Sequence, residues 1–266
     1  MDMFDLIGPI MIGPSSSHTA GAARIGRLAR LLLGGEPAQA KIGLWGSFQK
    51  TYQGHGTDRA LIGGLLGMEV DDIRLRDSLR YAREAGLVFS FAPARLRGAH
   101  PNTVVLELQN REGRSLRLQA ASVGGGEIVI QSVDGLEAGI TGHVNTLVLM
   151  YRDTPGMIAH ISGEVAASRL NIATMRVSRS AAGGEAMVTI ELDGVADDAL
   201  VARLAALRDV YHVSYLAMRA QTEACGDANG EIHRQDSDET PNETPNETQG
   251  TQHAQAEGRT PDANHC

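Results

Sequence analysis

Cysteine and lysine are among the residue types that this sequence uses least, with two of each. Both cysteines, Cys225 and Cys266, lie beyond residue 220, so the chain up to that point contains no thiol. An iron–sulfur cluster normally takes three or four thiolate ligands, and a disulfide framework needs paired cysteines. We therefore expect neither in residues 1–220 and assign no metal ligand to this chain. Lys41 and Lys50 are the only lysines, which argues against pyridoxal phosphate, because that cofactor requires a Schiff-base lysine.

Long apolar runs and aromatic residues are also scarce. No stretch reaches the roughly 18 apolar residues that indicate a membrane-spanning helix, and residues 1–5 lack the basic segment of a signal peptide. We therefore expect a cytoplasmic protein that has no membrane partner. Hydrophobic residues make up 42% of the chain and aromatic residues 4%, so its cores should be aliphatic.

The net charge of −8 arises at the C-terminal end. From Gln221 onward ten acidic residues face two arginines, whereas residues 1–220 carry 22 residues of each sign. Residues 1–220 therefore carry no net charge and give no sign of a nucleic-acid-binding face. Residues 220–266 contain one large aliphatic residue, Ile232, and no aromatic residue. This is too little apolar surface to offset the entropy lost on folding, so we predict a disordered acidic tail.

Five polar residues stand directly before the first predicted helix, which spans residues 20–33. They are Ser15, Ser16, Ser17, His18 and Thr19. Such a segment offers hydroxyl groups, a side chain that titrates near neutral pH and the unpaired N–H groups of a helix N-terminus. These groups together can bind a carboxylate or another small anion. The alternative is that one Ser or Thr merely caps the helix.

A second polar stretch, residues 54–58, lies between a predicted strand at residues 41–48 and a predicted helix at residues 59–67. His55 has a glycine on each side and therefore wide backbone freedom. Thr57 or Asp58 would cap the helix. Turn chemistry alone is equally consistent with a glycine-rich turn that carries a surface histidine.

Short β-type runs follow this helical start. We predict a short helix from Asp77 to about residue 86 and strands at residues 88–92, 103–108, 115–121 and 127–133. Residues 124–126, all glycine, fit a hairpin turn better than a phosphate cradle, because strands flank them on both sides. These elements predict an α+β domain over residues 1–140.

Residues 145–219 show a different order of elements. Predicted strands at residues 147–151, 173–178, 186–192 and 211–218 alternate with helices that begin after Gly156 and at Asp197. The order βαββαβ is the ferredoxin-like arrangement. The fold class is therefore α+β throughout, with the tail as a third segment.

The polar motifs resemble those of a known family. Gly13-Pro-Ser-Ser-Ser-His-Thr19, Gly46-Ser-Phe48 and residues 54–58, Gly-His-Gly-Thr-Asp, occur in this order in the beta chain of iron–sulfur-dependent L-serine dehydratase (L-serine ammonia-lyase). The similarity extends over residues 3–218. Residues 1–140 also resemble the accessory substrate-binding domain of some 3-phosphoglycerate dehydrogenases. The βαββαβ unit, with its Arg152-Asp-Thr-Pro-Gly156 turn, resembles an ACT domain, a module that usually binds amino acids.

The first resemblance implies that the chain is the beta subunit of a lyase that converts L-serine to pyruvate and ammonia, a reaction associated with gluconeogenesis. It implies a hetero-oligomer whose separate alpha chain ligates a [4Fe-4S] cluster, with one iron acting as a Lewis acid on the serine hydroxyl. His18 and His55 would be the catalytic acid and base, in an order that the sequence does not give. Substrate-binding roles would fall to Ser15, Ser16, Ser17, Thr19, Thr57 and Asp58.

The ACT resemblance implies an effector site in the turn between the first strand and the first helix of that unit. Its residues would be Asp153, Pro155, Gly156 and Asn171, at an interface formed by self-association of the ACT unit.

Two other functions stay open at this point. In the first, the chain is a non-catalytic regulatory subunit, in which residues 15–19 and His55 bind an effector anion and the ACT unit transmits the signal. In the second, it is a Ser/His hydrolase, a weaker hypothesis because the sequence has no nucleophile-elbow motif.

Overall fold

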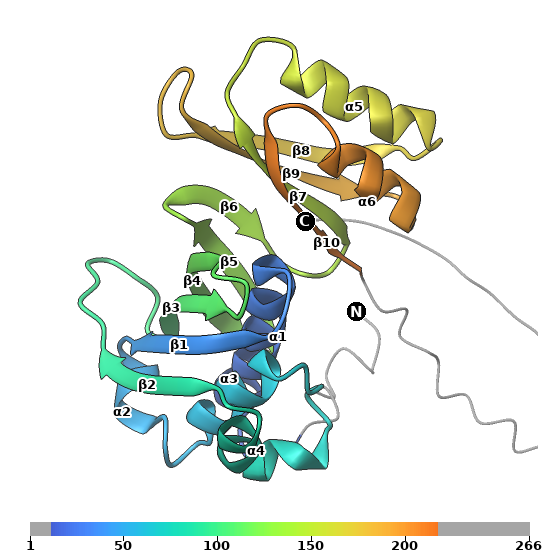
Figure 1. Ribbon diagram of the computed structural model, residues 1–266. Coiled ribbons are helices and arrows are strands. Elements are labelled where there is room, and N and C mark those ends of the chain that lie inside the picture. The colour runs from blue at the N-terminus through green and yellow to red at the C-terminus, as the bar shows by residue number, and fades with distance from the viewer. Residues whose placement is uncertain (1–11, 218–266) are drawn as a thin grey trace, which may run out of the picture. The chain divides into compact units, whose positions relative to one another are not determined.

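The computed structural model describes residues 12–217, which form two β-sheets with helices packed on them (Figure 1). Residues 1–11 and 218–266 lie outside the described residues, so the predicted tail at residues 220–266, with Cys225 and Cys266, lies outside them too. No helix within residues 12–217 is both long and apolar enough to cross a membrane. The mixture of helices and strands confirms the predicted α+β class.

The first sheet has six strands in the order β2-β1-β3-β4-β5-β6. Strands β3 to β6 form an antiparallel meander, as predicted, and β1 lies between β3 and the parallel edge strand β2. Gly125 and Gly126 form the turn between β4, which ends at Gly124, and β5, so the three glycines have the hairpin role expected for them. The bounds are β1 (Pro37–Leu44), β2 (Val88–Pro93), β3 (Thr103–Asn110), β4 (Ser115–Gly124), β5 (Glu127–Val133) and β6 (Leu136–Ile140).

One expectation for this sheet is wrong, and one of its strands was not predicted. Strand β1 ends at Leu44 instead of Phe48, and residues Ser47–Thr51 form a short helix, α2. The chain breaks away at Gly46, whose φ of 64° lies in the left-handed region that favours glycine. Strand β6 is also missing from the sequence prediction, because Gly139, with φ of 67°, interrupts its short apolar pattern.

Each predicted polar stretch leads into a helix. Residues Ser16–Ala20 form a single π-helical turn, η2, which continues into α1 (Gly21–Leu33). The second stretch leads into α3 (Thr57–Leu65), which is followed by a 3₁₀ helix, η3 (Ile73–Asp77), and by α4 (Ser78–Glu84). Helices α1 and α3 pack together beside the first sheet, where aliphatic side chains form the core (Figure 1).

Helices α1 and α3 cross with their backbones in contact. A Cβ atom added at Gly26 of α1 would lie 2.3 Å from the carbonyl oxygen of Leu61, and one added at Gly64 of α3 would lie 2.1 Å from that of Ala23. Only a hydrogen atom fits at these two positions. Because the two polar stretches lead directly into these helices, the crossing fixes where the stretches lie relative to each other.

The second sheet has four antiparallel strands in the order β10-β7-β9-β8. Its chain order is the βαββαβ predicted from the sequence, and both helices lie on one face of the sheet (Figure 1). Asp197 caps the second helix, as expected, by accepting a hydrogen bond from the Leu200 N–H at 2.7 Å. The elements are β7 (Asn145–Arg152), α5 (Met157–Ala167), β8 (Ile172–Arg179), β9 (Glu185–Leu192), α6 (Asp198–Ala205) and β10 (Val210–Leu216).

Replacing Gly26 by alanine tests the helix crossing. We expect Gly26→Ala to lower the free energy of unfolding by about 1–3 kcal/mol, the usual cost of inserting a methyl group where the neighbours leave no space. Gly163→Ala is the matched control, because Gly163 is also in a helix but has open space around its Cβ position. That change should be neutral or stabilise by up to about 1 kcal/mol. Denaturant unfolding measures both, and equal midpoints for Gly26→Ala and the unmodified protein would contradict the backbone contact.

Candidate active site

His18 lies in the π-helical turn and is held there by Ser15. The Ser15 hydroxyl oxygen accepts a hydrogen bond from the His18 backbone N–H at 3.1 Å, and the same oxygen lies 3.4 Å from His18 Nδ1. Ser15 is therefore the N-cap that the sequence suggested, and it also contacts the imidazole ring. Ser15 thus caps the turn and also contacts the site histidine, so the two roles do not exclude each other. Single π-helical turns often occur at functional sites.

The other ring nitrogen of His18 faces Ser47, since Nε2 lies 3.0 Å from the Ser47 hydroxyl oxygen. Sequence reasoning quoted Gly46-Ser47-Phe48 as a motif but did not name Ser47 as a site residue. Gly46 places Ser47 there: a Cβ atom at Gly46 would lie 2.5 Å from the Pro101 carbonyl oxygen. That same oxygen accepts the Ser47 N–H at 2.7 Å. Only glycine allows this close approach.

The two polar stretches meet at the histidine rings. The ring centroids of His18 and His55 are 4.9 Å apart, with an angle of 80° between the ring planes. Phe48 contacts the His18 ring edge-on at 5.3 Å. The Thr19 hydroxyl donates to the His55 carbonyl oxygen at 3.1 Å, which ties the second stretch to the first. Ser16 and Ser17 lie half-buried in the same π-helical turn.

Burial lowers the pKa of His18 below its ordinary value of 6.5, and the neighbouring His55 lowers it further. Burial acts because an imidazolium loses hydration when it is taken out of water, and His55 acts because two positive rings repel each other. His18 is therefore a neutral imidazole at neutral pH. In that form one ring nitrogen can accept a proton.

Thr57 and Asp58 lie at the start of α3 and are buried. The Asp58 carboxylate accepts a hydrogen bond from the Arg59 N–H at 2.8 Å. The N-cap of α3 is Gly56 and no side chain caps this helix, so the expected capping by Thr57 or Asp58 is wrong. Burial raises the pKa of Asp58, and the Arg59 N–H partly opposes this shift. The Thr57 hydroxyl has no hydrogen-bond partner among the described residues. A buried hydroxyl without a partner is costly, so Thr57 is a candidate for a contact that this chain alone does not supply.

A cavity of about 350 Å³ lies beside the histidine pair. Gly13, Thr19, His55 and Gly56 line it, so it opens between the two polar stretches. Two further lining residues are Arg59 and Arg76, which the sequence analysis did not name. Nothing in their spacing could have singled them out, because arginine is common along this part of the chain.

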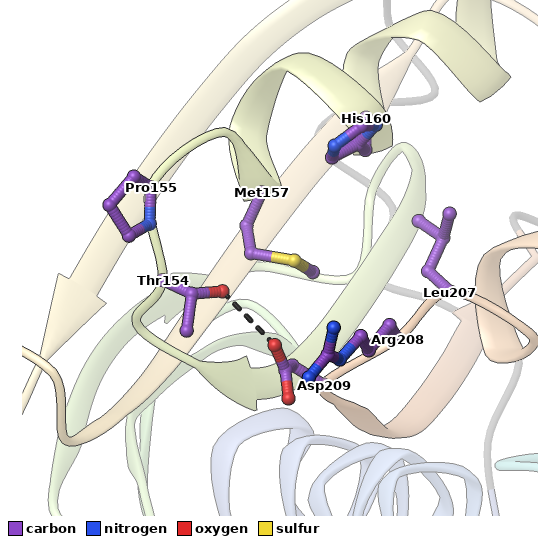
Figure 2. Close-up of a pocket in the computed structure, with 7 residues that line it drawn as sticks. All are labelled: Thr154, Pro155, Met157, His160, Leu207, Arg208 and Asp209. Carbon is purple, nitrogen blue, oxygen red and sulfur yellow. Dashed lines mark hydrogen bonds between the residues drawn. The ribbon is translucent and has the colours of Figure 1, made fainter.

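A second cavity, of about 550 Å³, lies at one end of the ACT-like unit. Figure 2 shows its lining residues, with the carboxylate of Asp209 accepting a hydrogen bond from the Thr154 hydroxyl at 3.3 Å. Asp209 has a left-handed φ of 71°, which is uncommon for a residue other than glycine. The lining consists of Thr154, Pro155, Met157, His160, Leu207, Arg208 and Asp209.

The four predicted effector residues are only partly brought together. Pro155 lines the cavity, and Gly156 is the N-cap of α5 with φ of 91°. The Asp153 carboxylate instead accepts from Arg179 at 2.9 Å and from the Gly183 N–H at 3.2 Å, and the bond from Arg179 is the main reason that its pKa is lowered. Asn171 lies at the other end of this sheet, since it precedes β8 and donates to Asp193.

The described residues do not fit an iron–sulfur cluster. Residues 12–217 contain no cysteine, and no group of three or more metal-ligating side chains occurs among them. Residues 12–217 therefore supply no ligand set for such a cluster.

Two protein families match this chain. Residues 145–209 match the ACT domain family, and residues 2–86 match the serine dehydratase beta chain family. The chain is 40% identical to a protein of Bacillus subtilis described as a probable L-serine dehydratase, beta chain, over 81% of this chain and 97% of the relative. It is 37% identical to the L-serine dehydratase beta chain of Peptoniphilus asaccharolyticus, over 71% of this chain and 86% of that one. The chain therefore belongs to the family of L-serine dehydratase beta chains.

A partial similarity extends to another class of enzyme. Over 96 residues, 35% of this chain, the sequence is 32% identical to the D-3-phosphoglycerate dehydrogenase of a Synechocystis species, of which the match covers 17%. The family matches over residues 2–86, which contain both polar stretches, and over residues 145–209 confirm the resemblances to a serine dehydratase beta chain and to an ACT domain.

The lowered pKa of His18 gives a testable pH dependence. We expect its ring to titrate below 6.5 in the folded chain. Near and below pH 6.5 the unfolded chain binds more protons at His18 than the folded chain does. The contribution of His18 to the free energy of unfolding is therefore complete above about pH 6.5 and decreases as the pH falls through the pKa of the folded chain. His55→Asn should raise the His18 pKa by removing the repulsion between the rings, but not to 6.5, because burial is the larger cause. NMR titration of the ring protons measures both values, and a His18 pKa above 6.5 would refute the assignment.

Proposed function

We propose that this chain is the beta subunit of an L-serine ammonia-lyase that converts L-serine to pyruvate and ammonia together with a separate alpha subunit. The observation that carries the proposal is the His18–His55 pair beside a cavity, in a chain whose relatives are L-serine dehydratase beta chains. The reaction needs a base for the Cα proton and an acid for the departing hydroxide. Two adjacent imidazoles at neutral pH are suited to these two tasks.

The surroundings of the two rings suit different positions in the reaction. His55 is exposed and lines the cavity, so it would meet the substrate. His18 lies against His55 and between the Ser15 and Ser47 hydroxyls, which can hold its ring or pass a proton. Loss of the Cα proton and of the serine hydroxyl, which leaves as water, gives aminoacrylate. This compound rearranges to an imine and is hydrolysed to pyruvate and ammonia.

The cluster in this proposal belongs to the alpha subunit. When bound there, a [4Fe-4S] cluster would supply a Lewis acid for the substrate hydroxyl. The role of this chain is to bring the histidine pair and the hydroxyl groups of residues 15–19 to the substrate. Thr57, buried and without a partner among the described residues, would complete the site once substrate or the alpha subunit is present.

The ACT domain would bind an L-amino acid, with L-serine as the first candidate. The cavity in Figure 2 supports this proposal, because it combines groups of both charges with an apolar wall. The Asp209 carboxylate is suited to the ammonium group of an amino acid, and Arg208 is suited to its carboxylate. Pro155 and the turn at Gly156 form the adjoining rim. Pairing of two ACT domains would enclose the ligand further.

The partial match to D-3-phosphoglycerate dehydrogenase favours a second candidate function. In this alternative, the His55 cavity binds a regulatory anion and the chain performs no chemistry. Both functions use the same cavity, so they differ in whether the histidines affect turnover.

Substitution of the histidines separates these functions. With an intact alpha subunit under anaerobic conditions, we expect His18→Ala and His55→Ala each to reduce serine-to-pyruvate turnover roughly 100-fold or more, the usual scale for acid–base groups. His143→Ala is the control, because His143 contacts Glu127 and is not among the residues that line the cavity. Melting temperatures show whether each variant is folded. Normal turnover in both folded histidine variants would favour the regulatory alternative.

The ACT proposal has its own test, in the assembled enzyme titrated with L-serine and monitored by thermal stability. We expect Arg208→Gln and Asp209→Asn each to weaken the L-serine-dependent stabilisation about tenfold, because each removes one charge-assisted hydrogen bond. Asparagine also tolerates the left-handed backbone at position 209. Arg203→Gln is the control, since Arg203 pairs with Glu164 and is not part of the cavity lining. An unchanged response in both variants would place the effector site elsewhere.

A further inference from the structure

The cavity beside His55 is lined by positive charge. Arg59 and Arg76 both contribute to its lining, and no acidic residue does. Both side chains are exposed, so each remains free to move toward a bound molecule. A mouth lined by two guanidinium groups and an imidazole selects for an anion.

Packing fixes the two segments that bring the arginines to the cavity. Arg59 is the third residue of α3, directly after the stretch that carries His55. The Ser78 hydroxyl donates to the Arg59 carbonyl oxygen at 2.6 Å, which fastens the segment after η3 to the start of α3. Leu75 packs so closely on α3 that a Cβ atom at Gly63 would lie 2.2 Å from its Cδ2 atom. Arg76 follows Leu75 and is therefore carried to the cavity by a fixed segment.

Arg74, two residues before Arg76, is paired with a carboxylate. Arg74 donates to both carboxylate oxygens of Asp72, at 3.0 Å to each from its Nε atom. In contrast, neither Arg59 nor Arg76 forms an ion pair with a carboxylate within residues 12–217. Two arginines without a carboxylate partner, beside a cavity that contains a histidine, have the chemistry of a carboxylate-binding pair.

We infer that Arg59 and Arg76 bind the carboxylate of the amino-acid substrate and thereby place its Cα atom beside His55. The inference rests on the proposed function for the identity of the substrate. With the carboxylate bound by the arginines, Ser15 is not needed to bind it, which is consistent with the contact that the Ser15 hydroxyl already makes with His18. The hydroxyl groups of the first polar stretch are then left to act on the histidine or on the substrate hydroxyl.

Steady-state kinetics of the complete enzyme provide the first test. A contact that is equally strong in the ground state and the transition state affects KM more than kcat. We therefore expect Arg59→Gln and Arg76→Gln each to raise the KM for L-serine roughly tenfold, the scale of one charge-assisted hydrogen bond, with kcat changed far less. Lysine at either position should recover part of the loss, since it keeps the charge but not the fork of donors. Arg74→Gln, the control, should leave KM unchanged. Unchanged KM values in both cavity variants would overturn the inference.

A second test does not depend on turnover and so separates this inference from the proposed function. The ring resonances of His55 are followed by NMR in the isolated chain during titration with 3-hydroxypropionate, which has the carboxylate, and with L-serinamide, which lacks it. We expect 3-hydroxypropionate to shift the His55 resonances in the unmodified chain and in the Arg74→Gln variant. It should not shift them in the double variant Arg59→Gln/Arg76→Gln. L-Serinamide should not shift them in any of the three proteins. Equal shifts in the double variant, or no shift in the unmodified chain, would overturn the inference. Shifts as expected in the isolated chain, together with a complete enzyme that releases no pyruvate from L-serine, would refute the proposed function alone.

Discussion

The backbone contact between α1 and α3 is the constraint on which the candidate site depends. Each helix begins where one polar stretch ends, so the position of His18 relative to His55 follows from how closely the helices approach. Gly26 and Gly64 permit an approach at which a Cβ atom on either would lie closer than 2.5 Å to a carbonyl oxygen of the other helix. A wider crossing would separate rings whose centroids are now 4.9 Å apart. Two glycines remote from the histidines thus determine the contact between them.

A second effect of this closeness is electrostatic. The same packing that buries His18 also brings it beside another histidine, and both factors disfavour its charged form. The site therefore keeps a neutral imidazole at the pH where an unperturbed histidine begins to protonate. Beside it, the cavity is lined by two guanidinium groups. The half-buried imidazole of His18 and the exposed guanidinium groups thus lie in different parts of one site.

The sequence could predict what depends on neighbours along the chain. The polar stretch that contains His18, the glycine-flanked His55, the β-meander and the βαββαβ order all have local patterns of polar, glycine or alternating apolar residues. The π-helical form of residues 16–20 was not expected. Ser47 could not be placed beside His18 in advance, because its position depends on Gly46 meeting Pro101, a contact across more than fifty residues. Arg59 and Arg76 likewise acquire their role through the packing of η3 on α3. Asn171 was grouped with the effector turn by resemblance, whereas the topology of the second sheet puts it at the opposite end.

The π-helical turn at Ser16–Ala20 makes the site sensitive to chain length as well as to residue identity. Such a turn accommodates one residue more than a regular helical turn, and here the Gly21 N–H reaches back five residues to the Ser16 carbonyl oxygen. Deleting one residue would convert this turn into a regular helical turn and change where the side chains within it lie. His18, which lies in the turn, would then lose its position beside Ser47. The number of residues in this turn is therefore as much a part of the site as their identity.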